Sequence, residues 1–171
     1  PFARRQRLYC KKSGKILRLE VRDATDLKVV SQIFRSEDYN LARLRRWADI
    51  EACYRGLVGA GETPLIVDCG ANIGASAAYL AEQFPRAKVL AVEPQPGNYE
   101  LLARNCAGNP RIVPIRAAVA SEDKRGALVD PGKGGWAFRV SEQPGGEVEM
   151  VSINTLVGRG EGTPFVVKID I

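Results

Sequence analysis

Residues 64–93 read PLIVDCGANIGASAAYLAEQFPRAKVLAVE, and this stretch decides the fold class. The apolar run at 65–67 predicts a strand buried on both faces, because it lacks the polar alternation of a half-exposed strand. Residues 75–84 predict a helix that ends before Pro85, and residues 89–92 predict a second strand. The stretch is therefore one β-α-β unit, with a ligand site expected at the carboxyl ends of its strands.

Polar residues and glycines stand where the two strands end. Asp68 follows the first strand, and Gly70 and Gly74 bracket a loop whose missing β-carbons would let a ligand approach the backbone. Glu93 follows the second strand, where a carboxylate can accept hydrogen bonds from both hydroxyls of a ribose. Taken alone, Glu93 reads equally well as a surface residue before a turn. Together these residues favour a ligand site.

The spacing of the glycines indicates which class of ligand the loop would bind. A dinucleotide fold would carry Gly-x-Gly-x-x-Gly directly after the strand, whereas this loop reads Asp-x-Gly-x-Asn-x-Gly from Asp68 to Gly74. An acid would repel the pyrophosphate of a dinucleotide but suits a ligand with an ammonium group. S-adenosylmethionine has an ammonium group, a ribose and no phosphate, and it is the predicted cofactor.

Three motifs in the same order resemble those of a known family. They are VDCGANIG at 67–74, AVEPQP at 91–96 and FVVKIDI at 165–171. They are similar to the class I methyltransferases and specifically to the FkbM-type family, over about residues 64–171. The resemblance implies an α/β fold with a doubly wound, mostly parallel, Rossmann-like sheet. In that family an apolar residue and Glu-Gly follow Lys-Ile-Asp, so we expect a native chain that continues beyond the fourth parallel strand.

The resemblance also implies roles for individual residues. The methionine part of S-adenosylmethionine would be held by Asp68, Gly70, Asn72 and Gly74. Glu93 would hold its ribose. The segment after the third strand would approach the adenine through Ala117, Ala118 and Val119. Ordinary packing at a strand end is the alternative for that last segment. The cofactor-binding residues implied in this way are Asp68, Gly70, Asn72, Gly74, Glu93 and Ala118.

Asp170 is the candidate catalytic residue. It follows the predicted fourth strand at 165–169, so it should meet Asp68 and Glu93 at one crevice of the sheet. It could orient the surroundings of the transferred methyl group or help to deprotonate a substrate hydroxyl. The alternative is a strand-end acid bound to a loop amide. The chain has no histidine, which excludes a His base and a His metal ligand.

The predicted reaction is O-methylation of a hydroxyl group on a small molecule or a sugar. The fourth strand lacks the Asn/Asp-Pro-Pro-Tyr pattern that we associate with methylation of base amines, which favours a hydroxyl acceptor. The alternatives are a non-catalytic binding module that keeps the fold, a nucleic-acid methyltransferase and, less favoured, an NAD-dependent oxidoreductase. No metal is expected, because the four cysteines are scattered without a Cys-x-x-Cys pair.

Residues 1–63 are expected to pack on the core domain at 64–171. The pattern predicts a hairpin over 8–21, a helix capped at Asp23 or Thr25, and a second helix over 41–58 whose Trp47 and Tyr54 contact the core. Residues 1–22 carry eight Lys or Arg against one acid, Glu20. This basic segment is either an arm for an anionic partner such as nucleic acid or, as we favour, a solvated edge hairpin.

The rest of the chain predicts a helix over 96–107 and antiparallel strands over 126–152, inserted before the fourth parallel strand. Trp136 in this insert is either a packing residue or an aromatic on the substrate side. No apolar run approaches the roughly 18 residues of a membrane span, so we expect a cytoplasmic protein without a membrane partner. A sheet that ends on a central strand is unstable, so we expect self-association, including a homo-oligomer, of these 171 residues alone.

Overall fold

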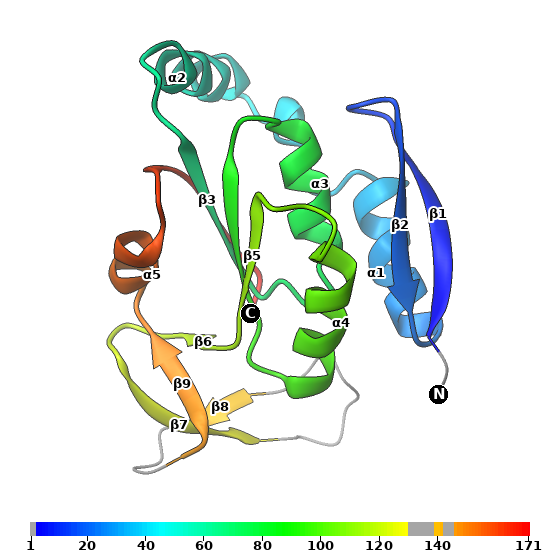
Figure 1. Ribbon diagram of the computed structural model, residues 1–171, viewed down its shortest axis with the longest axis vertical. Helices are drawn as coiled ribbons and strands as arrows, with labels where there is room; N and C mark the ends of the chain where they lie inside the picture. The colour runs from blue at the N-terminus through cyan, green and yellow to red at the C-terminus, as the bar shows by residue number, and fades with distance from the viewer. Residues whose placement is uncertain (1–2, 130–138, 142–145) are drawn as a thin grey trace.

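A computed structural model describes residues 3–129, 139–141 and 146–171 of the chain (Figure 1). Its centre is a four-stranded parallel sheet in the order β10-β3-β4-β5. The strands are β3 (Pro64–Cys69), β4 (Lys88–Val92), β5 (Ile112–Ile115) and β10 (Thr163–Ile169). The fold is mixed α/β with a parallel sheet, as the sequence predicts.

The order of the strands creates a switch point beside β3. The chain runs outward from β3 through β4 to β5, and then returns to the other side of β3 to form β10. Every residue of β3 is buried, which confirms the strand predicted from the apolar run at 65–67. The strand continues to Cys69, so Asp68 lies within β3 and not after it.

Helices cover both faces of this sheet. On one face, α3 (Ala75–Gln83) and α4 (Pro96–Cys106) pack on Ile66, Val89 and Ala91. On the other face, Leu156 of α5 (Ile153–Arg159) packs on Leu65 and Val67. Figure 1 shows α3 and α4 on one side of the strands and α5 on the other. The helices α3 and α4 confirm the predicted crossovers.

Helix α5 has no counterpart among the elements predicted from the sequence. This helix has only seven residues, about two turns, which is too short to show a helical period in the sequence. The one available signal is its cap, because the Ser152 Oγ accepts a hydrogen bond from the Thr155 backbone N–H at 3.1 Å.

The second predicted helix starts later than expected. Residues Leu41–Arg43 form a 3-10 turn, η1, and the helix α2 begins only at Trp47 and ends at Gly59. The Asn40 side chain caps the turn, and Leu44 is extended, with φ −75° and ψ 144°, so the backbone cannot continue as one helix. The prediction that α2 contacts the core is confirmed, because the rings of Trp47 and Tyr54 both lie against Phe84.

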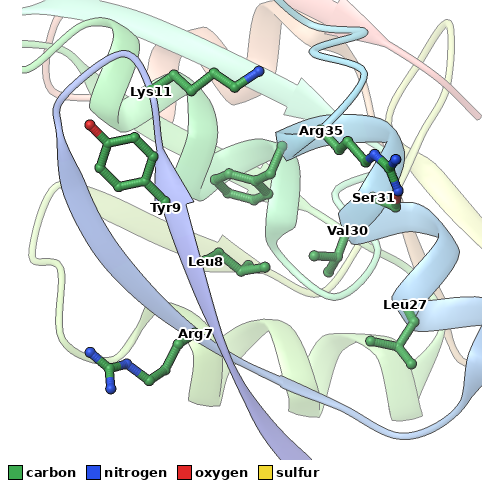
Figure 2. A pocket seen from close by; sticks show the side chains of 9 residues that line it. Arg7, Leu8, Tyr9, Lys11, Leu27, Val30, Ser31 and Arg35 are labelled. Atoms are coloured by element: carbon green, nitrogen blue, oxygen red, sulfur yellow. The ribbon is translucent and has the colours of Figure 1, made fainter.

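The N-terminal residues form the predicted hairpin and helix. The hairpin is β1 (Arg4–Cys10) paired with β2 (Lys15–Val21), and α1 (Ala24–Phe34) follows with Asp23 as its N-cap. Residues of this unit share one buried cluster with Tyr79 of α3 and Leu101 of α4. Between β1 and α1 lies an open groove of about 420 Å³, and Figure 2 shows Leu8, Leu27 and Val30 directed toward it.

A second sheet precedes β10 in the chain. Its order is β6-β9-β7-β8, and its strands are β6 (Ala118–Val119), β7 (Lys124–Val129), β8 (Arg139–Ser141) and β9 (Val148–Val151). Strand β7 pairs antiparallel with both β8 and β9, which confirms the predicted antiparallel insert. Trp136, which the sequence analysis singled out in this insert, lies outside the described residues. Across the described ranges, none of the helices has the length and apolar character needed to cross a membrane.

Candidate cofactor and catalytic site

The predicted site lies at the carboxyl ends of three adjacent strands, where the strand order switches. The glycine loop follows β3, Glu93 follows β4, and Asp170 follows β10. The loop is fastened to the end of β4, because the backbone N–H groups of Gly70 and Ala71 both donate to the Val92 carbonyl, at 3.0 and 2.9 Å. Crevices at such switch points are where open α/β sheets bind ligands.

Glu93 is buried at the centre of this edge, with 6% of its surface exposed. Its carboxylate accepts hydrogen bonds from the backbone N–H of Asn72 at 2.9 Å and of Gln95 at 3.0 Å, and from the Asn98 side chain at 3.4 Å. Burial raises the pKa of Glu93, and the hydrogen bonds from Gln95 and Asn72 partly offset that rise. The residue therefore joins the glycine loop to the start of α4.

Asp68 is completely buried and already has partners within the chain. The Lys168 Nζ lies 2.9 Å from its Oδ1, and the Ser76 hydroxyl donates to its Oδ2 at 2.6 Å. Lys168 also donates to the Gly70 carbonyl at 2.9 Å, so one cation of β10 contacts both the acid and the loop. No role was predicted for Lys168, although a charged residue inside the apolar run of a predicted strand was a signal.

The glycines are needed for close packing within the chain. Gly70 has φ +76°, and a β-carbon there would lie 2.0 Å from the Asp170 carbonyl oxygen. Gly74 has φ +88°, and its β-carbon would lie 2.8 Å from Leu102 Cδ1 and 3.0 Å from Cys106 Sγ. Atoms of the protein thus fill the direction in which each missing β-carbon would point, so a ligand would have to reach the loop backbone from another side. Asn72 also has positive φ, at 49°, which asparagine tolerates better than most residues.

Asp170 lies beside the loop and contacts a tyrosine from the N-terminal part of the chain. The Tyr39 hydroxyl donates to the Asp170 Oδ2, and the Lys168 Nζ lies 5.1 Å from the centre of the Tyr39 ring. Burial and the contact with Asp170 raise the pKa of Tyr39, which keeps its hydroxyl protonated. Tyr39 lies between the two helices predicted for residues 1–63, and no role was predicted for it from the sequence.

Ala118 belongs to the second sheet, three residues after β5 ends at Ile115. It lies in β6, pairs with Met150 of the second sheet and is buried. The other five predicted cofactor residues all belong to the end of β3, the loop or the end of β4, and Asp170 lies next to them. The structure therefore brings six of the seven candidate residues together at one edge of the sheet.

Comparison with known proteins agrees with this architecture. The Methyltransferase FkbM domain matches residues 68–171 of the chain. Methyltransferase sdnD from Sordaria araneosa is 42% identical over 65 residues, which are 38% of this chain and 25% of that relative. The matched region thus spans a quarter of the length of this curated relative.

Proposed function

The chain belongs to the Methyltransferase FkbM domain family, and from this premise we propose that it is an S-adenosylmethionine-dependent methyltransferase. The proposed reaction is transfer of the methyl group to a hydroxyl on a small molecule or a glycan. The strand order and the helices on both faces of the sheet support a Rossmann-like class I fold. A relative whose name is that of a methyltransferase supports the same reaction class.

The observation that carries the proposal is the position of Glu93. A buried carboxylate stands at the carboxyl end of β4, next to the switch point, and a glycine loop lies against it. A ribose presents two neighbouring hydroxyl donors, and a carboxylate has two oxygens to accept them. The residues present therefore suit the ribose of S-adenosylmethionine, and Glu93 would hold it.

The loop would hold the methionine part of the cofactor. We assign this role to Gly70, Asn72 and Gly74 through their backbone, and to Asp68 through its charge. Because Lys168 lies against Asp68, a bound ammonium group would share that carboxylate with the lysine. Ala118 would approach the adenine from the second sheet. When bound, S-adenosylmethionine supplies a methyl group on a sulfonium, which an acceptor can attack directly.

The protein would act mainly by positioning the acceptor. Holding two reactants in near-attack geometry can lower a barrier by roughly 7 to 11 kcal/mol, so a strong base is not required. Asp170 would orient the acceptor hydroxyl or take its proton, and Tyr39 would hold Asp170 in place. We place the cofactor site in a domain at 64–171, with residues 1–63 packed on it; the cytoplasmic location stays a prediction from the sequence.

Calorimetric titration of S-adenosylmethionine into the wild type and Glu93→Ala tests the proposal. We expect clear loss of affinity in Glu93→Ala and none in the control Glu100→Ala, whose exposed carboxylate lies on α4, the helix that follows Glu93 in the chain. Equal affinity of Glu93→Ala and the wild type would reject the ribose assignment. Mass spectrometry of extracts incubated with isotopically labelled cofactor would then identify the acceptor.

A further inference from the structure

A row of polar contacts joins the N-terminal unit to Glu93. The guanidinium of Arg22, the residue after β2, binds both carboxylate oxygens of Asp26, each at 2.9 Å. Its Nη2 also donates to the Oδ1 of Asn98 on α4 at 2.7 Å. The Asn98 Nδ2 in turn lies 3.4 Å from the Glu93 Oε1. Asp26, Asn98 and Glu93 are all buried, so solvent competes little with these contacts.

The chemistry of the guanidinium sets the orientation of the asparagine. Arginine has only hydrogen-bond donors, so Asn98 must turn its amide oxygen toward Arg22. The amide NH₂ then faces Glu93, where it donates to the carboxylate. Without Arg22 the amide could rotate and present its oxygen to Glu93, and two acceptors would face each other. Arg22 thus stabilises the orientation in which Asn98 donates to the carboxylate.

Asp26 already balances the charge of Arg22. The carboxylate binds the guanidinium in a two-bond fork and also accepts the Arg22 backbone N–H at 2.7 Å. Arg22 therefore acts on Glu93 through the orientation of Asn98 more than through an unbalanced positive charge. A lysine would keep the charge but could not form the same planar fork and reach Asn98 with fixed geometry.

We propose that Arg22 is a positioning residue of the cofactor site: through Asn98 it holds the Glu93 carboxylate in the orientation that binds the ribose. This inference rests on the proposed function. It extends the site beyond the family match at 68–171, because Arg22 and Asp26 belong to the N-terminal unit. The N-terminal unit then contributes to cofactor binding as well as to packing.

The first test needs no ligand. In Arg22→Met, amide hydrogen exchange at Asn72 and Gln95, which donate to Glu93, should accelerate by about tenfold, as expected for the loss of a hydrogen bond near a charged group. The amides of Gly70 and Ala71 lie in the same loop but donate to the Val92 carbonyl, and they should keep their rates. Unchanged exchange at Asn72 and Gln95, or equal acceleration at all four amides, would overturn the inference.

The second test uses the ribose itself. Calorimetry would compare S-adenosylhomocysteine with its 2′,3′-dideoxyribose analogue. Arg22→Met should lower the affinity for S-adenosylhomocysteine by about tenfold and leave the affinity for the analogue unchanged. Only S-adenosylhomocysteine has the hydroxyls that Glu93 would bind. Arg22→Lys should recover part of the affinity for S-adenosylhomocysteine that Arg22→Met loses. Equal weakening of both ligands would indicate a purely structural role and would overturn the inference.

Two further variants keep the result clear. Arg104→Met is the matched control, because Arg104 also joins α4 to the hairpin, through Glu20 at 3.1 Å, without contacting Asn98 in the described part of the chain. Arg104→Met should change neither the amide exchange at Asn72 and Gln95 nor the affinity for S-adenosylhomocysteine. If Arg22→Met does not fold, Asn98→Ala removes the amide while keeping the Arg22–Asp26 pair, and it should reproduce both effects. If the wild type binds no S-adenosylhomocysteine, the proposed function fails and the cofactor part of the inference fails with it, while the exchange test separately decides whether Arg22 orients Glu93.

Discussion

The Lys168 Nζ lies 2.9 Å from the Oδ1 of Asp68, and the two residues are direct neighbours in the register of β10 and β3. Asp68 is completely buried, and the Lys168 side chain is only 10% exposed. Removing one partner of such a pair leaves the other charge buried without compensation. The pair therefore couples the stability of the sheet to the candidate site.

We expect Asp68→Asn and Lys168→Met each to lower the free energy of unfolding by about 3 to 5 kcal/mol, as for other broken buried ion pairs. The double variant Asp68→Asn/Lys168→Met should lose less than the sum, because neither charge remains unpaired. Urea unfolding of the wild type, the two single variants and the double variant measures these free energies of unfolding. Additive losses would show that the two charges do not interact.

Cofactor binding should depend on the ionisation of Glu93, whose pKa burial raises above the ordinary value. The ribose hydroxyls need an ionised acceptor, so the affinity for S-adenosylmethionine should rise with pH through this raised pKa. Glu93→Gln should bind more weakly and lose that pH dependence. Calorimetry across a pH series checks this, and identical profiles for the two proteins would contradict it.

The same raised pKa predicts a stability effect of known sign. Because the folded protein holds the Glu93 proton more tightly than the unfolded chain, this group favours folding most at low pH. That contribution should fall as the pH rises from the ordinary glutamate pKa through the folded value. In urea unfolding over this range, the free energy of unfolding of the wild type should fall relative to that of Glu93→Gln as the pH rises. A difference between the two proteins that stays constant with pH would argue against this.

Tyr39→Phe should slow the reaction and leave cofactor binding intact. The substitution removes the hydroxyl that donates to Asp170 but keeps the ring beside Lys168. We expect kcat to fall by about tenfold, less than the roughly 10²- to 10⁴-fold contribution of a whole proton-transfer group because Asp170 itself remains, with the Kd of S-adenosylmethionine unchanged. Tyr54→Phe is the control, because that hydroxyl accepts the Arg86 N–H away from the site. Equal kcat values for both variants would remove Tyr39 from the mechanism.

Gly74→Ala should destabilise the protein. The left-handed backbone at φ +88° costs a non-glycine residue about 1 to 2 kcal/mol, and the clash with Leu102 and Cys106 adds to it. Gly108→Ala is the control, because a β-carbon there meets nothing within 4 Å. Thermal unfolding should therefore show a much lower Tm for Gly74→Ala than for Gly108→Ala. Similar Tm values would mean that the loop adjusts to a β-carbon.

Local patterns in the sequence were enough to predict most of the elements. The apolar run at 65–67 identified β3, because a strand covered on both faces needs apolar side chains on both sides. The alternation and the turn at 8–21 identified the hairpin. The short helix α5 and the start of α2 were not predicted, since two turns show no period and an extended Leu44 interrupts a helical pattern.

The sequence by itself determined the β-α-β unit and the residues at its strand ends, because hydrophobic period and turn chemistry act over a few neighbouring residues. Only the tertiary structure decided the partners of those residues. Lys168 and Gly70 are 98 positions apart, Tyr39 and Asp170 are 131 apart, and Arg22 and Asn98 are 76 apart. Charged and polar side chains pair according to their distance in space and their burial, and a linear pattern carries neither.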